Sequence, residues 1–316
     1  MGEVNVVLGS GPLGTAVVNH LADQGVPVRV ANLEGRADVP SGVQVVAADL
    51  SDPGQAKRAC ADAHVVYHCA SPPYHLWAKL HPPLMEAAIS GAAAAGAKLV
   101  FGDNLYAYGR VDGPITEDLP YQARGPNGSA RTAIAEAVIN GHLSGRVRAT
   151  IGRGSDFFGP RCRLSAVGEQ VFERALNRKR AQVLGNPDVP HSVTYIEDFA
   201  RALVTLGEND HALGEVWHVP CAPAAPIRQF VDLIGHAAGH PTRLRVTPAW
   251  AIALAALRDP TLKAVREQLY QHQNPWVVDS SKFEKAFGWE ATPLLDAVEA
   301  TVAWFSKQED KQEEMS

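Results

Sequence analysis

A glycine-rich turn between an apolar strand and a helix most constrains the fold of this chain. Residues 4–14 read VNVVLGSGPLG, and the apolar-patterned segment TAVVNHLADQG follows directly. Glycine permits the backbone angles of a tight turn, a close approach of the main chain to phosphates, and close packing of helix on strand. The amides and the dipole at the start of the helix attract an anion. The pattern predicts a dinucleotide site, whose pyrophosphate-binding residues are Gly9, Gly11, Pro12, Leu13 and Gly14.

Apolar segments rich in β-branched residues continue through the first half of the chain, with helical segments between them. We expect strands at 4–8, 26–33, 43–50, 61–71, 97–104 and 147–156, and helices at 55–62, 77–95 and 130–143. Strands that alternate with helices favour a parallel sheet with right-handed crossovers. The predicted fold is α/β, a Rossmann-type doubly wound parallel sheet.

The residues after about 160 follow another pattern, with short strands among helices. Helices are expected at 164–179, 195–207, 227–238, 248–271 and 292–305, and short strands at 215–219 and 243–246. We therefore expect a dinucleotide-binding domain over 1–160. A smaller, mostly helical substrate lobe over 161–306 is expected to interleave with the last sheet strands. Residues 307–316 are charged without an apolar face and are expected to form a solvated tail.

Composition argues against several classes of partner. The net charge of −5 gives no reason to expect nucleic acid. The most apolar stretch outside the strands, 250–257, is too short to span a bilayer, so no membrane partner is expected. The four cysteines show no CxxC spacing, and the first residues leave no room for a leader before the first strand. These features predict reduced thiols in a cytoplasmic protein.

Six further motifs carry a resemblance to a known family. They are DLSD (49–52), HCASPP (68–73), DNLYAYG (103–109), RGSDFFGP (153–160), HSVTYIEDFARAL (191–203) and a helical ending over 274–305. In this order and spacing the chain resembles the extended short-chain dehydrogenase/reductase family, the relatives of nucleotide-sugar epimerases and dehydratases. The resemblance places further residues at the cofactor: Asp49 and Leu50 at adenine, Cys69, Ala70 and Ser71 beside it, and Gly154 and Ser155 near the nicotinamide.

The catalytic residues of that family are only partly matched. The family uses a Ser, together with a Tyr that is followed four residues later by a Lys, and the Tyr passes a proton to or from the substrate oxygen. Here Asn104 takes the place of the Ser, Asn127 that of the Tyr and Arg131 that of the Lys. An amide has no titratable proton, and Arg131 can bond ribose hydroxyls but cannot relay a proton. The chain therefore resembles the atypical branch of the family, with a degraded catalytic set.

Two phenols could replace the missing acid. Tyr108 occupies a family position near the substrate pocket, and Tyr106, two residues away, would face the same side of an extended segment. Tyr108 is the preferred candidate. A structural aromatic at the end of a strand is its alternative interpretation.

The end of the second strand bears on the choice between NAD and NADP. An acidic residue there usually bonds the ribose diol of NAD, and this chain has Asn32 instead. Arg36 could clamp a 2′-phosphate, whereas Glu34 could still serve the diol. The sequence favours NADP(H) and leaves NAD possible.

Substrate contacts are expected from an aromatic and imidazole group after the fourth strand and from the residues after the sixth strand. These are His75, Trp77, Asp156, Phe157 and His191. The histidines at 64, 68, 75 and 81 lack the spacing of a metal motif, so no metal is expected.

Three functions fit these observations. The preferred one is an NADP(H)-dependent oxidoreductase acting on a small or medium carbonyl or alcohol substrate. The alternatives are an epimerase or lyase that uses bound cofactor without net redox, and a catalytically silent NAD(P)-sensing binding protein. By analogy with the family we expect a homodimer formed through the helices after the fourth and fifth strands.

Overall fold

The structure is a computed structural model that describes residues 4–314, with side chains as far as residue 308. The chain forms two compact units that interleave in sequence. The first contains the residues up to Gly109, then Glu117–Gly154 and Phe199–Val219. The second contains Arg110–Thr116, Ser155–Asp198 and the residues from Pro220 onward.

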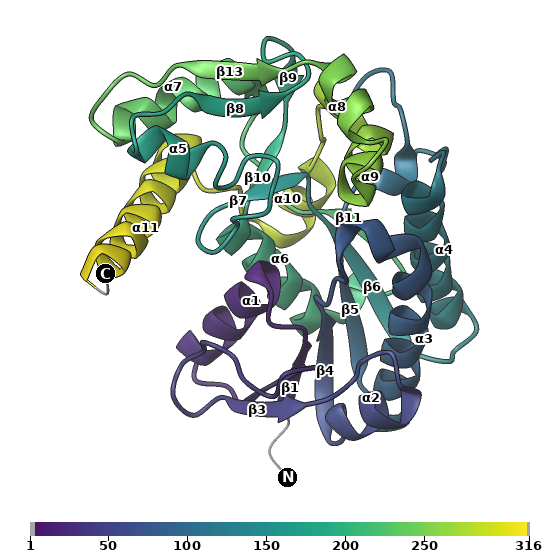
Figure 1. Ribbon diagram of the computed structural model, residues 1–316. Coiled ribbons are helices and arrows are strands. Elements are labelled where there is room, and N and C mark those ends of the chain that lie inside the picture. Colours follow the sequence, from purple (N-terminus) through teal and green to yellow (C-terminus); the bar gives the residue numbers. More distant parts are fainter. Residues whose placement is uncertain (1–3, 315–316) are drawn as a thin grey trace. The chain divides into compact units, whose positions relative to one another are not determined.

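The first unit is built on a seven-stranded parallel sheet in the order β11-β6-β5-β4-β1-β2-β3 (Figure 1). The strands are β1 (Val4–Leu8), β2 (Val28–Asn32), β3 (Gln44–Ala47), β4 (Ala63–His68), β5 (Lys98–Asp103), β6 (Arg148–Arg153) and β11 (Val216–His218). The order reverses between β1 and β4, the place where doubly wound sheets bind ligands at the carboxyl ends of their strands. The predicted Rossmann-type fold is confirmed, including a late strand that returns to the sheet.

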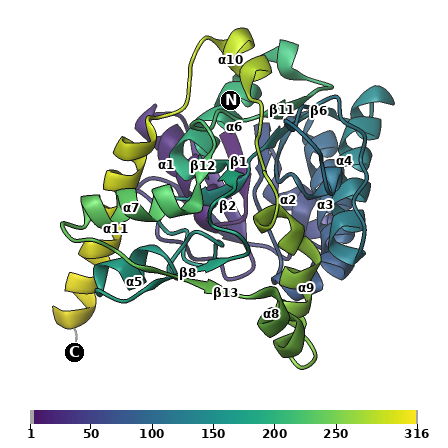
Figure 2. The same ribbon diagram turned by 90° about the horizontal axis from the view of Figure 1, so that it is seen from above.

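Helices cover both faces of this sheet: α2, α3 and α4 on one face, and α1 and α6 on the other (Figure 2). They are α1 (Pro12–Asp23), α2 (Pro53–Ala59), α3 (Trp77–Ala95), α4 (Pro126–Leu143) and α6 (Ile196–Glu208), with short 3-10 turns at η1 (Tyr74–Leu76), η2 (Tyr106–Tyr108) and η3 (Asp210–Ala212). Helix α4 begins four residues before the predicted start, because Pro126 suits the first helical position. Asn127 and Arg131 consequently lie one turn apart on a single helix.

The second unit combines helices with three two-stranded sheets, β7–β10, β9–β12 and β8–β13. Its strands are β7 (Asp156–Phe158), β8 (Ala181–Leu184), β9 (Pro190–His191), β10 (Val193–Tyr195), β12 (Ala225–Pro226) and β13 (Leu244–Thr247). Its helices are α5 (Phe172–Leu176), α7 (Ile227–Ala237), α8 (Ala249–Ala255), α9 (Pro260–Gln268), η4 (Leu269–His272), α10 (Ser281–Phe287) and α11 (Leu294–Glu314). Packed phenylalanine rings form the centre of its core, among them Phe158, Phe172 and Phe230.

Three predicted helical segments differ in the structure. Only α5 is an α-helix within 164–179, because the chain before it turns tightly: a Cβ on Gly168 would lie 2.2 Å from the carbonyl oxygen of Cys162. The segment 248–271 breaks at Asp259, whose carboxylate caps the start of α9. The predicted tail is helical through Glu314, since no glycine or proline interrupts it.

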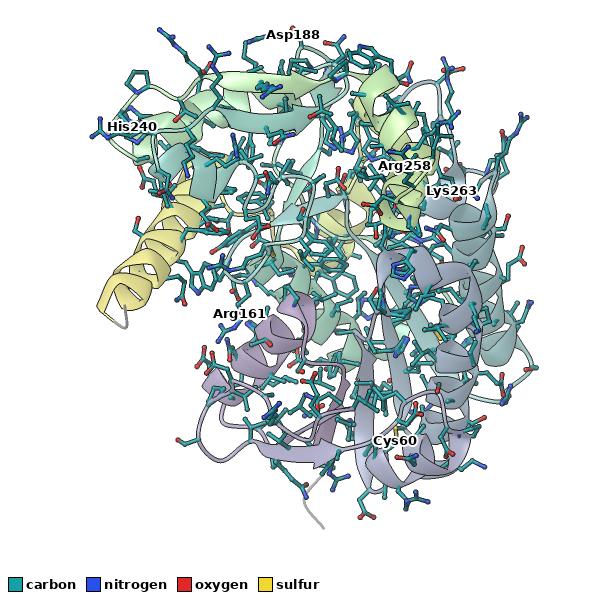
Figure 3. The ribbon with its side chains drawn as sticks, in the orientation of Figure 1. Cys60, Arg161, Asp188, His240, Arg258 and Lys263 are labelled. Carbon is teal, nitrogen blue, oxygen red and sulfur yellow. The ribbon has the colours of Figure 1, made fainter. Side chains whose placement is uncertain are left out.

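Two expectations about the cellular setting can be compared with the structure. All four cysteines are free thiols, and Cys60 lies at the end of α2 (Figure 3). Among residues 4–314, no helix is both long enough and apolar enough to cross a membrane.

Candidate cofactor and active site

The glycine turn between β1 and α1 has the shape of a phosphate cradle. Gly9 has φ +99°, and a Cβ there would lie 2.6 Å from the Cα of Ala70. A Cβ on Gly14 would lie 2.0 Å from the carbonyl oxygen of Gly9, so helix and turn are in direct contact. At Gly11, by contrast, a Cβ would meet no atom within 4 Å. Pro12 and Leu13 open α1, and the first amides of a helix have no partner within it. The turn therefore fits a pyrophosphate, with an open position where the ligand approaches.

The loop after β2 is held by Asn32. Its Nδ2 donates to Ser10 Oγ at 2.6 Å and to the Arg36 carbonyl at 2.9 Å, while its Oδ1 accepts from the Gly35 amide at 2.7 Å. The side chain that replaces the usual acid thus joins the glycine turn to the β2 loop. The Arg36 side chain is exposed and forms no ion pair within the described part of the chain.

The remaining predicted cofactor residues of this unit lie after β3, β4 and β6. The Asp49 carboxylate accepts from the Ser51 amide and hydroxyl, and these hydrogen bonds lower the pKa of Asp49. Leu50 is buried, Cys69 donates its amide to Leu8, and Ala70 packs against Gly9. Ser71 is exposed, and Gly154 leaves room for the ring of Phe199. Gly9, Asp49 and Cys69 all follow the carboxyl ends of strands in one sheet.

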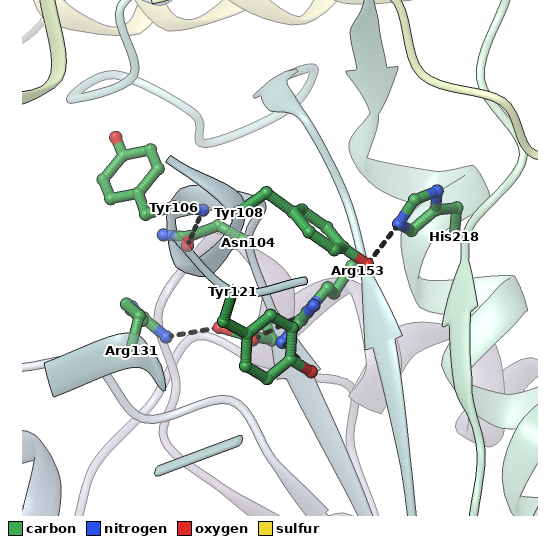
Figure 4. Close-up of polar contacts among 8 residues, drawn as sticks. Asn104, Tyr106, Tyr108, Tyr121, Arg131, Arg153 and His218 are labelled. Atoms are coloured by element: carbon green, nitrogen blue, oxygen red, sulfur yellow. Dashed lines mark hydrogen bonds and ion pairs between the residues drawn. The ribbon is translucent and has the colours of Figure 1, made fainter. Parts of the chain in front are cut away.

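In the core of the first unit, Asp103 binds two arginines, one of which is the predicted catalytic residue Arg131 (Figure 4). Its Oδ1 lies 3.0 Å from Arg131 Nη1, and its Oδ2 lies 3.0 Å from Arg153 Nε. The Asp103 and Arg153 side chains are fully buried, and that of Arg131 is 6% exposed. Two guanidinium groups therefore share one carboxylate, which leaves this group of three side chains with a net positive charge.

Tyr106 and Tyr108 do not share a side, contrary to the prediction. They lie in the 3-10 turn η2 rather than in an extended segment, and Figure 4 shows their rings pointing apart. Tyr108 is 1% exposed, and its hydroxyl lies 2.8 Å from His218 Nε2. Burial raises the pKa of Tyr108 to about 12, opposed by the nearby charge of Arg153. This setting matches the structural interpretation of Tyr108 better than proton donation.

Tyr106 instead belongs to a partly exposed aromatic cluster formed with Tyr74 and Trp77. The guanidinium carbon of Arg131 lies 4.1 Å from the centre of the Trp77 ring, and the charge of Arg131 also interacts with Tyr106. Asn127 donates to the Tyr74 carbonyl at 3.3 Å and is itself buried. Asn104 accepts from the Tyr106 amide at 3.0 Å. Asn104, Asn127 and Arg131 thus all help to hold this cluster.

The predicted substrate residues fall into both units, and the predicted cofactor residue Ser155 lies in the second. His75 is exposed and Trp77 half-buried in the first unit. Ser155, Asp156, Phe157 and His191 lie in the second, where the Ser155 amide donates to Thr194 Oγ1 at 2.9 Å. His191 Nε2 lies 3.0 Å from Asp156 Oδ2, and His272 Nε2 lies 3.7 Å from the same oxygen.

The sequence reasoning did not predict the contacts that Asp103, Arg153 and His272 make in these groups, and it considered Arg153 only as a possible partner of a substrate diphosphate. The contact between Asp103 and Arg153 follows from strand register, because β5 and β6 are neighbours and these two residues are paired. No local pattern indicates His272, which is far in sequence from Asp156 and His191. The expectation that no metal binds at the histidines 64, 68, 75 and 81 remains a prediction.

Comparisons with known proteins agree with this architecture. The model of the NAD dependent epimerase/dehydratase family matches residues 6–219. No curated protein matches the sequence closely enough to count as a relative. Among solved structures, UDP-glucose 4-epimerase of Thermotoga maritima with UDP-glucose has 19% identity and TM-score 0.80, covering 96% of this chain and 99% of its own. The dTDP-glucose 4,6-dehydratase of Bacillus anthracis in complex with NAD has 14% identity and TM-score 0.80, covering 98% of both chains.

At these identities the solved structures show the fold, whereas the family match extends over more than half of the chain. The matched range contains the glycine turn, Asn104, Asn127 and Arg131. The chain belongs to the NAD dependent epimerase/dehydratase family and is an enzyme of the short-chain dehydrogenase/reductase type.

Proposed function

We propose that the chain is an NADP(H)-dependent oxidoreductase that interconverts a small or medium carbonyl compound and its alcohol. The observation that carries this proposal is the cradle at Gly9, Gly11 and Gly14, together with Asn32 in place of the acid that would repel a 2′-phosphate. The exposed Arg36 follows Asn32 on the same loop and can pair with such a phosphate. When bound, the nicotinamide supplies or accepts the hydride.

Tyr106 is the proton donor in this proposal, in preference to Tyr108. Its phenol is partly exposed, and the permanent charge of Arg131 stabilises a phenolate, as the Lys of the resembled family does for its Tyr. During reduction the Tyr106 hydroxyl gives its proton to the carbonyl oxygen, while the carbonyl carbon receives the hydride. Asn104 helps to orient Tyr106 by accepting its amide proton.

Cofactor binding tests the proposal directly. We expect NADPH to bind about tenfold or more tightly than NADH, because the charge-assisted pair with Arg36 is available only to the 2′-phosphate. Arg36→Gln should weaken NADPH about tenfold and leave NADH unchanged. Arg58→Gln, at an exposed arginine on α2, is the matched control. Equal binding of both cofactors, or tighter NADH, would contradict the NADP(H) assignment.

An epimerase or dehydratase that retains its cofactor is the second candidate, favoured by the similarity to the Thermotoga maritima and Bacillus anthracis enzymes. A panel of aldehydes and ketones separates the two functions. An oxidoreductase consumes NADPH in proportion to product, whereas an epimerase changes its substrate without net consumption.

The proposed assembly is a homodimer. Helices α3 and α4 pack together on one face of the sheet; α3 contains the run Ser90–Ala95 of small residues and α4 contains spaced alanines, which permit close helix approach. Light scattering after gel filtration gives the mass, and a monomer at micromolar concentration would contradict this part of the proposal.

A further inference from the structure

Three metal-ligating side chains converge in the second unit. They are Asp156 on β7, His191 on β9 and His272 at the end of η4. One ligand atom from each residue can be chosen so that all three lie within 4.8 Å of one another. The two imidazole rings stack with their centres 5.2 Å apart, and both direct Nε2 toward Asp156 Oδ2.

Backbone hydrogen bonds hold the three residues in place. Parallel pairing of β7 with β10 sets Asp156 opposite Val193, two residues beyond His191. The Trp276 amide donates to Pro190, and the Ser192 amide donates to Trp276, so the segment after His272 is tied to both sides of His191. This arrangement supports the ligands on rigid main chain, as a metal site requires.

The loop before β9 approaches His272 so closely that only glycine fits. The Asn186 amide donates to the His272 carbonyl at 2.6 Å. Gly185, with φ +68°, precedes it, and a Cβ there would lie 2.1 Å from the same carbonyl oxygen. The position of His272 is thus set by direct contact with backbone.

The charge of this cluster favours a cation. The Asp156 side chain is 13% exposed, and within residues 4–314 its ion-pairing partners are the two imidazoles, with no lysine or arginine among them. A largely buried carboxylate needs a compensating positive charge. A metal ion between the three side chains supplies one.

The donor set identifies the class of metal. Two imidazole nitrogens and one carboxylate oxygen suit Zn²⁺ and neighbouring transition metals, while Mg²⁺ and Ca²⁺ prefer oxygen ligands alone. Metal bonds of about 2.0–2.1 Å in a tetrahedral site separate neighbouring ligand atoms by roughly 3.3 Å. The observed separations of 3.0 Å and 3.7 Å lie on either side of this value.

We infer that Asp156, His191 and His272 bind one divalent transition-metal ion of the zinc class and leave a fourth coordination position open. All three ligands lie within the second unit, so the inference does not depend on the proposed cofactor or reaction. A hydrogen-bonded Asp–His cluster that binds no metal is the competing interpretation.

Cobalt titration tests the site with a spectroscopic signal. The full-length chain, without a histidine tag and treated with a chelator, is titrated with Co²⁺ and then with Zn²⁺. We expect one equivalent of Co²⁺ to give the intense visible absorption of a four- or five-coordinate site, and one equivalent of Zn²⁺ to abolish it. His272→Gln and Asp156→Asn should each weaken Co²⁺ binding at least tenfold. His236→Gln, at an exposed histidine on α7, should not change it.

Thermal unfolding distinguishes a variant that has lost the metal site from one that does not fold. Thermal unfolding of the wild-type chain is followed with and without Zn²⁺, and we expect the ion to raise Tm in the wild type and not in His272→Gln. The inference is overturned if the wild type binds no stoichiometric Co²⁺. It is also overturned if folded His272→Gln and Asp156→Asn bind Co²⁺ as tightly as the wild type does.

Discussion

Substitution of Asp103 tests how much the buried ionic group contributes to the stability of the first unit. The Asp103 carboxylate is the shared partner of Arg131 and Arg153, and Arg153 also lies 4.8 Å from the ring centre of Tyr108. Removing one member of a buried ionic group costs more than the pair itself contributes, because the remaining charge keeps its desolvation penalty. We therefore expect this group of three side chains to stabilise the core of the first unit.

Asp103→Asn should consequently lower the free energy of unfolding by about 3–5 kcal/mol. Urea denaturation followed by circular dichroism measures the change. Asp188→Asn is the control, because the Asp188–Arg228 pair is exposed and should contribute little. A loss in Asp103→Asn no larger than in Asp188→Asn would show that the buried pair does not stabilise the unit.

The two phenols of η2 form a natural pair of variants. Tyr106→Phe removes the proposed acid and should lower kcat by about 10²–10⁴-fold while cofactor affinity stays within a fewfold of wild type. Tyr108→Phe removes the hydroxyl bonded to His218 and should lower stability with a much smaller effect on kcat. Steady-state kinetics on the best carbonyl substrate, with cofactor titrations in parallel, distinguish the two. The reverse pattern would return the donor role to Tyr108.

In the β1–α1 turn, substitutions of two glycines allow the effect on packing and the effect on ligand binding to be measured separately. Gly11→Ala should leave the unfolding midpoint nearly unchanged, since a Cβ there meets no neighbouring atom, yet it projects a methyl group into the proposed pyrophosphate position. NADPH affinity should fall at least tenfold. Gly14→Ala should lower both stability and affinity, because its Cβ would overlap the Gly9 carbonyl. Calorimetric titration and thermal unfolding provide the two readouts, and normal NADPH binding by Gly11→Ala would argue against the cradle.

The elements also show how far sequence reasoning reaches. The sheet strands from β1 to β6 were predictable, because the strands of a parallel sheet are apolar runs rich in β-branched residues. Tyr106 and Tyr108 were misjudged because a two-residue spacing faces one side only in an extended chain, and the 3-10 turn rotates them apart. The break at Asp259 could have been predicted from the Asp-Pro pair, which ends one helix and caps the next.

The sites were harder to predict because they combine distant segments. The Asp103–Arg153 contact follows from the parallel pairing of β5 with β6. Both strands were predicted from the sequence, but not that they are neighbours. His272 reaches Asp156 only through the packing of η4 against the β8–β9 loop at Gly185. Such tertiary contacts leave no periodic or motif signal in a single sequence.

Buried histidines in the first unit, His68 and His81, should make the protein sensitive to mild acid. Burial, with the charge of Arg131, lowers the pKa of His68 to about 4. The pKa of His81 is lowered for the same reasons as that of His68. Between about pH 6.5 and 4 the unfolded chain therefore binds protons that the folded chain does not. The free energy of unfolding must fall as the pH falls through this window, by a few kcal/mol for a fully buried histidine.

His68→Leu isolates one of these contributions without removing a hydrogen bond. Neither ring nitrogen of His68 has a partner within the described part of the chain, so the leucine variant should be about as stable as the wild type at pH 8. Between pH 6.5 and 4 its stability should fall less steeply, because one proton fewer distinguishes the unfolded from the folded state. Urea midpoints across this range, with exposed His236→Gln as the control, measure the difference. If His68→Leu and the wild type lose stability in parallel, His68 does not stay neutral in the folded chain.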